Sequence, residues 1–386
     1  MTLREPSFTF GIEEEYHLVD LETRDLAAAP AALMTDCEAV LGKQVSPEFL
    51  RSQIEVGTKV CRTFAAARAD LSLLRTTIAA KARAYGLAPI AASTHPFSML
   101  NKLETTPKDR YRTIARDLAG VSRRLAYCGM HVHVGIEDED LRIDLMNQVR
   151  YFLPHLLMLS TSSPFWEGED TGLKSWRIAI NHELPRSGVP GYFESAGEFQ
   201  RTIDVLVKNG VIEDATKIWW DLRPSVRFPT LEMRVTDIST RLDDAITVAA
   251  LYVCIVRMLF RLRRRNLTWR TYPLILLEEN RWRAQRYGVD GSLFDLGSGE
   301  LVAFRDLIEE LIDLVAEDAA ALGCSEHVAR ARTIAAEGTS ADRQLARFNS
   351  LREAGADRQA ALRGVVDMLI EETTHALQCD DREARS

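Results

Sequence analysis

The stretch FGIEEEYHLVD, residues 10–20, decides the fold because it alternates like a β-strand. Successive side chains of a strand point to opposite faces, so one face here is apolar and the other carries Glu13 and Glu15. Glu14 falls on the apolar face, where a carboxylate needs a partner such as an arginine. Adjacent carboxylates repel, so a folded protein that stacks Glu13 and Glu15 usually holds a cation between them. A solvated strand face is the alternative interpretation.

Three further segments repeat this division: RSQIEVGT (51–58), CGMHVHVGI (128–136) and TLEMRV (230–235). Each is apolar at alternate positions, and the opposite faces carry Gln53 and Glu55, His131 and His133, and Glu232 and Arg234. Taken singly, a solvated face, two structural histidines or a buried Glu–Arg ion pair would explain these patterns. Four strands with the same polar face together favour a functional sheet face.

The residue types on this face favour hard divalent cations. Carboxylates with an imidazole suit Mg²⁺ or Mn²⁺ better than structural zinc, and several carboxylates allow two or more ions that bridge phosphates. The sequence contains no G-x-x-x-x-G-K-[ST] and no G-x-G-x-x-G motif. If ATP binds, metal held by carboxylates must therefore do much of the work that a glycine-rich loop does elsewhere.

Strands dispersed among long helical patterns, such as 65–85, predict an α+β fold with an antiparallel sheet. A helical pattern at 141–160 contains Pro154, which should kink or break it. Beyond residue 293 four helical patterns follow, roughly 300–322, 326–337, 340–353 and 358–377. We expect residues 1–292 to form a catalytic sheet with helices and residues 293–386 a helical region packed on it, within one structural domain.

Composition limits the partners and the location. The net charge of −8 gives no electrostatic reason to expect nucleic acid, and the basic run 261–265 follows an apolar helix, as cations at a helix C-terminus do. The longest apolar run, 245–256, is too short for a membrane span, and the N-terminus lacks a signal-like apolar segment, so we expect a cytoplasmic protein. The six cysteines form no C-x-x-C pair and predict reduced, unpaired thiols.

At these residues the sequence resembles the YbdK-type carboxylate–amine ligases, which are grouped with the type 2 glutamate–cysteine ligases. The resemblance covers nearly the whole chain in the family's order, through the segments FGIEEEYHLVD (10–20), RSQIEVGT (51–58), STHPF (93–97), CGMHVHVGIED (128–138), WWDLRPS with TLEMRVTD (219–237) and ENRWRAQRYGVDG (279–291). It implies a glutamine-synthetase-like catalytic fold, a curved antiparallel sheet shaped as a funnel with helices outside. It also implies the use of ATP and Mg²⁺, with Mn²⁺ as a second candidate.

The resemblance assigns roles to residues of the polar face. The implied metal ligands are Glu13, Glu15, Glu55, Glu232 and one of His131 or His133. The implied catalytic residues are Arg234, which contacts phosphate, with Glu55 and Arg177. The implied substrate and ATP contacts are Gln53, Thr58, Arg177, Arg223 and Arg234. Relatives commonly carry glycine where this chain has Pro229, and proline removes an N–H that could contact a ligand.

We therefore predict an ATP-dependent C–N ligase that activates a carboxylate as an acyl phosphate and transfers it to an amine, giving γ-glutamylcysteine from glutamate and cysteine. Three alternatives stay open: a phosphotransferase of related fold, a zinc hydrolase built on His131 and His133, and a non-catalytic nucleotide- or amino-acid-binding protein. The expected partners are small molecules, without nucleic acid or membrane. A homodimer is expected from base rates alone.

Overall fold

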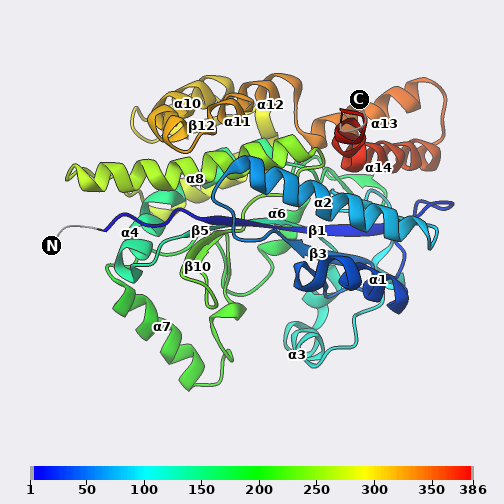
Figure 1. Cartoon of the computed structure of the whole chain (residues 1–386), viewed down its shortest axis with the longest axis horizontal. Coiled ribbons are helices and arrows are strands. Elements are labelled where there is room, and N and C mark those ends of the chain that lie inside the picture. Colours follow the sequence, from blue (N-terminus) through cyan, green and yellow to red (C-terminus); the bar gives the residue numbers. More distant parts are fainter. Residues whose placement is uncertain (1–3, 384–386) are drawn as a thin grey trace.

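The computed structural model describes residues 4–383, without the side chains of residues 102 and 375–383. A seven-stranded antiparallel sheet crosses the molecule with its strands in the order β10, β11, β5, β1, β3, β2, and β4 pairs with β1 (Figure 1). The strand bounds are β1 Phe10–Asp20, β2 Val45–Pro47, β3 Gln53–Gly57, β4 Leu87–Ile90, β5 Met130–Gly135, β10 Leu222–Pro224 and β11 Thr230–Met233. The predicted α+β class with an antiparallel sheet is confirmed.

Three small strand pairs lie outside this sheet. They are β6 Phe165–Trp166 with β7 Glu169–Asp170, β8 Ser187–Gly188 in parallel with β9 Trp219–Trp220, and β12 Ser292–Asp295 with β13 Glu300–Ala303. The described helices are α1 Ala31–Leu41, α2 Phe64–Arg83, α3 Asp109–Leu118, α4 Glu139–Val149, α5 Leu153–Ser160, α6 Trp176–Asn181, α7 Ala196–Lys208, α8 Leu242–Arg264, α9 Leu274–Tyr287, α10 Phe304–Ala321, α11 Ser325–Ala329, α12 Ala331–Glu337, α13 Ser340–Glu353 and α14 Arg358–Glu383.

The strand register places the predicted polar residues on one face of the sheet. Glu13 of β1 lies directly opposite His131 of β5, and Glu15 lies opposite Glu55 of β3. His133 in turn lies opposite Glu232 of β11. Directly opposed residues of an antiparallel pair share a face, so the alternation predicted for the four strands is confirmed.

The other face of the sheet is the core. Its side chains, such as Ile12, Val132 and Leu231, are fully buried. Helices α2 and α8 cover this face, and α10–α14 form a further layer beyond them, whereas α3 and α7 extend from the opposite side of the sheet (Figure 1). One hydrophobic cluster runs from β1 through α8 to α12. The boundary proposed at residue 293 stays a prediction.

Helix α8 is the central core helix. It is long and apolar enough to span a membrane by length and composition, but 83% of its most apolar window is buried inside the protein. The basic run ends this helix as expected, and Arg261 pairs with Asp318 of α10 at 2.8 Å. The five cysteines whose side chains are described are free thiols, and Cys379 lies outside the described side chains.

Two parts of the predicted helical pattern differ from the structure. Residues Glu300–Ala303 form strand β13 instead of the start of a helix, and α9 was not predicted at all. The break at Pro154 is confirmed, because a 3₁₀ turn over Arg150–Phe152 separates α4 from α5, and Pro154 lies in the first turn of α5.

Candidate active site

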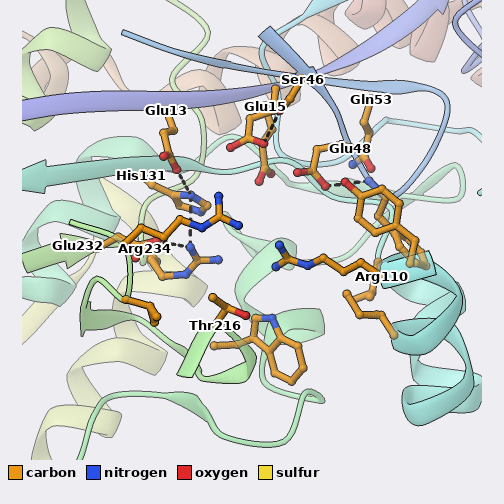
Figure 2. Close-up of a pocket in the computed structure, with 18 of the residues that line it drawn as sticks. Glu13, Glu15, Ser46, Glu48, Gln53, Arg110, His131, Thr216, Glu232 and Arg234 are labelled. Atoms are coloured by element: carbon orange, nitrogen blue, oxygen red, sulfur yellow. Dashed lines mark hydrogen bonds and ion pairs between the residues drawn. The ribbon is translucent and has the colours of Figure 1, made fainter. Parts of the chain in front are cut away.

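A cavity of about 490 Å³ lies on the polar face of the sheet (Figure 2). All but two of the predicted site residues line it: Glu13, Glu15, Gln53, Glu55, His131, His133, Arg223, Glu232 and Arg234. Figure 2 shows Glu13, Glu15 and Glu48 along one wall, His131, Glu232 and Arg234 beside them, and Arg110 and Thr216 on the facing side. Strands of the sheet thus supply a rigid anionic wall, and segments outside the sheet close the cavity.

Glu13, His133 and Glu232 form the first group that could hold a metal ion, since one ligand atom from each lies within 4.8 Å of the others. His133 Nδ1 lies 3.0 Å from Thr230 Oγ1, which fixes the ring. His133 Nε2 is buried without a hydrogen-bond partner among the described residues and faces Glu13 Oε1 at 3.4 Å. An unpartnered ring nitrogen held by a hydrogen bond at the other nitrogen is the usual arrangement of a metal-binding histidine.

His131 differs from His133. Its Nδ1 lies 3.4 Å from Glu13 Oε2 and 3.5 Å from Arg234 Nη1. Burial, reinforced by the Arg234 guanidinium, lowers the pKa of His131 to about 4, so its imidazole is neutral at physiological pH. A neutral imidazole can bind metal, so this pKa does not exclude His131. The grouping of His133 with Glu13 and Glu232 favours His133 as the ligand.

Two arginines hold Glu232 in place. Arg223 Nε donates to Glu232 Oε2 at 2.8 Å, and Arg234 Nη1 donates to the other carboxylate oxygen. Burial acts to raise the pKa of Glu232, but Arg234 and Arg223 together hold it well below its usual range. The Glu232–Arg234 ion pair that the sequence offered as an alternative therefore exists, and it leaves Glu232 ionised within the first group of candidate metal ligands.

Glu15, Glu48 and Glu55 form a second group of carboxylates. Glu15 Oε2 accepts from the Gly129 amide at 2.7 Å, and Ser46 Oγ donates to Glu55 Oε2 at 3.0 Å. Burial and the neighbouring Glu55 raise the pKa of Glu15 to about 7, and burial with nearby carboxylates also raises the pKa values of Glu48 and Glu55. A bound cation would relieve this repulsion, so buried oxygen donors of this kind fit Mg²⁺ or Mn²⁺.

Two predicted residues lie outside the cavity lining. Thr58 Oγ1 accepts from the Ile12 amide at 3.0 Å and so joins β1 to the segment after β3. Arg177 is buried, and its Nη atoms donate to the carbonyls of Arg234 and Val235. A Cβ at Gly129 would lie 2.5 Å from Arg177 Nη2, which explains the glycine there. Their proposed ligand contacts stay predictions, and both residues support strands that carry site residues.

Several lining residues lie in segments whose sequence pattern did not predict a site. Glu48 follows the three-residue strand β2, which is too short to show alternation. Helix α3 brings Arg110 and Tyr111, and the segments near 216–219 and 225–228 bring Thr216, Trp219 and Phe228. These residues come from loops and one helix whose position depends on tertiary contacts. The only sequence signal was the WWDLRPS segment, through its place in the resemblance.

The fold and the site define an ATP-dependent ligase that joins a carboxylate to an amine. The model of the glutamate–cysteine ligase family 2 matches residues 9–371. A protein of Rhodospirillum rubrum named putative glutamate–cysteine ligase 2 is 60% identical over 383 residues and 98% of each chain, and one of Jannaschia sp. with the same name is 55% identical over 96% of this chain and 98% of its own. The chain belongs to glutamate–cysteine ligase family 2.

Solved structures of low sequence identity share the fold. A glutamate–cysteine ligase of Francisella tularensis, in complex with AMP, is 12% identical with a TM-score of 0.67 over 99% of this chain and 95% of its own. A bifunctional glutathione synthetase of Pasteurella multocida has the same TM-score at 15% identity, over 96% of this chain and 52% of its own. The predicted family resemblance and ligase class are confirmed, and these structures share the predicted α+β fold.

Proposed function

We propose that the chain activates the γ-carboxylate of glutamate with ATP and transfers the acyl group to the amine of cysteine, giving γ-glutamylcysteine. The observation that carries this proposal is the group of Glu13, His133 and Glu232 on one sheet face, with Arg234 against Glu232. The carboxylates of Glu15, Glu48 and Glu55 line the same cavity. Two divalent ions held there would neutralise the phosphoryl oxygens of ATP. The names of the close relatives support glutamate and cysteine as the first substrates to test.

In this proposal, Glu13, His133 and Glu232 would hold one Mg²⁺, and Glu15, Glu48 and Glu55 would hold another, with Mn²⁺ as a substitute; the ions would neutralise charge on the phosphoryl oxygens. A substrate carboxylate oxygen bonds to the γ-phosphorus of ATP while the bond to the bridging oxygen breaks, which releases ADP and leaves an acyl phosphate. The amine nitrogen then bonds to the acyl carbon, the bond to phosphate breaks, and the amine proton leaves to phosphate or water. Arg234, ion-paired to Glu232, is placed to stabilise charge on the transferred phosphoryl group.

The test is ADP release by the purified chain with Mg²⁺-ATP and pairs of amino acids, with mass spectrometry of the products. Glutamate with cysteine is the lead pair, and we expect ADP together with an amide. ADP with a stable phosphorylated product would instead support the phosphotransferase alternative. ATP binding without consumption by any pair would support a binding protein.

The role of the carboxylates has its own test. Glu13→Gln and Glu232→Gln should abolish amide formation and weaken Mn²⁺ binding in calorimetry, because each removes a charged oxygen ligand. Glu278→Gln is the matched control, since Glu278 is exposed on α9 away from the cavity. Variants that lose melting temperature in proportion to activity, with unchanged Mn²⁺ affinity, would assign the carboxylates a structural role instead.

We also propose a cytoplasmic location, and we expect no nucleic acid partner at a net charge of −8. A homodimer remains a proposal from base rates. Size-exclusion chromatography with light scattering would measure the oligomeric state directly.

A further inference from the structure

A buried guanidinium lies behind the candidate active site. Arg177 stands in the first turn of α6 and is only 3% exposed, so its side chain belongs to the interior of the protein. Its Nη2 donates to the Arg234 carbonyl at 2.9 Å, and its Nη1 donates to the Val235 carbonyl at 3.3 Å. Both carbonyls directly follow β11, the strand that carries Glu232. The guanidinium therefore fixes the backbone from which the Arg234 side chain enters the cavity.

The same guanidinium packs against Gly129, the residue before β5. The Gly129 amide donates to Glu15 Oε2 at 2.7 Å, and the Gly129 carbonyl accepts from the Glu15 amide at 3.1 Å. A Cβ on Gly129 would lie 2.5 Å from Arg177 Nη2 and 3.0 Å from Arg177 Cζ. Gly129 does not have a positive φ, so this close approach is the physical reason for glycine at the position. Arg177 thus lies directly against the backbone that holds Glu15.

Arg177 is itself held from other sides. Its amide donates to Ser163 Oγ at 3.1 Å, and its Cζ lies 5.7 Å from the centroid of the Tyr127 ring. Its Nη1 lies 3.9 Å from Asp237 Oδ1. Asp237 is fully buried and accepts hydrogen bonds from neighbouring serines, which fix its position. The guanidinium therefore cannot move aside without breaking several of these contacts.

We propose that Arg177 is a positioning residue that sets how the two groups of candidate metal ligands lie relative to each other. Through the Arg234 carbonyl it places the arginine that pairs with Glu232 of the first group. Through Gly129 it places Glu15 of the second group. Residues behind the direct ligands commonly orient them in this way. The inference rests on the proposed ligase function, but its main readout is Mn²⁺ affinity, which needs no turnover.

The test uses variants that keep the positive charge, because removing a cation beside carboxylates strengthens metal binding by itself. Gly129→Ala places a methyl group against the guanidinium, so the start of β5 must shift and the amide of residue 129 moves away from Glu15. We expect the affinity for one Mn²⁺ ion in calorimetry, and kcat for amide formation, each to fall about tenfold. The KM values for glutamate and cysteine should stay unchanged, because Arg177 does not line the cavity.

A second substitution should rescue the first. Arg177→Lys keeps the charge but replaces the planar fork by a compact ammonium, which leaves room for the new Cβ. In the double variant Gly129→Ala, Arg177→Lys, the Mn²⁺ affinity should recover relative to Gly129→Ala alone, so the two losses should not add. Gly197→Ala is the matched control, because a Cβ there lies 3.2 Å from Nη1 of Arg201, which is exposed on α7 and can rotate away.

Two results would overturn the positioning role and leave the ligase function intact. The first is a Gly129→Ala variant that binds Mn²⁺ as tightly as the unaltered chain, or a double variant that binds it no better than Gly129→Ala. The second is an Arg177→Lys variant with a raised KM for ATP or glutamate and unchanged Mn²⁺ affinity, which would make Arg177 a substrate contact.

Urea midpoints of every variant separate unfolding from a loss of affinity, because unfolded chain lowers the amount of Mn²⁺ bound but not the Kd of the folded part. If Gly129→Ala does not fold, we expect the double variant to fold and bind Mn²⁺, and its failure to do so would overturn the proposal. If no amino-acid pair gives an amide, the ligase function fails, whereas rescue of Mn²⁺ affinity still supports the positioning role. Absence of Mn²⁺ binding by the unaltered chain would overturn both.

Discussion

The buried ion pair between Glu14 and Arg75 offers the sharpest test of how the site strand is held. Both side chains are fully buried, and Arg75 Nε and Nη2 donate to the two Glu14 oxygens at 2.9 and 2.6 Å. Tyr16 donates its hydroxyl to the same carboxylate. Arg75 also donates to the carbonyls of Ser239 and Thr240, at 2.9 and 2.6 Å. One guanidinium therefore joins β1 to the segment that leads into α8.

Arg75→Met should destabilise the fold by about 3–5 kcal/mol, the usual cost of leaving a buried charge without its partner. Typical domains have only about 5–15 kcal/mol of stability, so this single change brings the chain near unfolding. The double variant Glu14→Leu, Arg75→Met removes the charge as well. It should recover part of that loss but retain the cost of two carbonyls without donors, about 1–3 kcal/mol each.

The assay is urea unfolding followed by circular dichroism and by the fluorescence of the six tryptophans. Arg83→Met is the matched control, because Arg83 lies on the same helix but is exposed. Metal binding should fall in Arg75→Met, since Glu13 and Glu15 flank the disturbed residue. If Arg75→Met unfolds at the same urea concentration as Arg83→Met, the reasoning is refuted. If the double variant loses as much stability as the two single variants together, or more, the two charges are not coupled.

Three further outcomes are expected. Burial lowers the pKa of His95 from 6.5 to about 4, so the unfolded chain binds this proton more readily than the folded protein does. The free energy of unfolding should therefore decrease by about 3 kcal/mol as the pH falls from about 6.5 to about 4, since one pKa unit corresponds to about 1.4 kcal/mol. The urea midpoint of His95→Asn should fall less over this pH range than that of the unaltered chain. An equal fall in both proteins would contradict the prediction. Glu48→Gln should raise the Mg²⁺ concentration for half-maximal ADP release about tenfold or more, whereas Glu38→Gln on the exposed side of α1 should not. Pro229→Gly restores an N–H beside the cavity and should lower the KM for ATP; an unchanged KM would show that no ligand contact is missing there.

The sequence was sufficient to predict which residues share the polar face of the sheet, because the alternation of side chains along a strand is a local property. Glu13, Glu55, His133 and Glu232 each stand on a strand whose neighbours alternate with them, so their common face follows from parity and needs no knowledge of the pairing order. The same parity marked Glu14 as a carboxylate that needs a cation, and the structure supplies Arg75.

Tertiary contacts decide what the sequence could not show. Arg75 lies in a long helix where any of several arginines could have been the partner of Glu14, and only the packing of α2 on the sheet selects it. Glu48 stands after a strand of three residues, where no period is visible. The contacts of Arg186 with Lys217 and Trp219, which are 31 and 33 residues away by their numbers, likewise appear only in the folded chain.

The three consecutive glutamates of β1 also explain why the strand keeps one register. A slip of one residue would turn Glu13 and Glu15 into the core and Glu14 into the cavity, because the side-chain period of a strand is two. Arg75, fully buried there, would then face two carboxylates, and the proposed cation sites on the polar face would lose Glu13 and Glu15. The native register instead gives the core carboxylate one guanidinium and places the outer two in the cavity, where we propose that they bind metal. The charge pattern that makes β1 suitable for catalysis thus also opposes its misalignment.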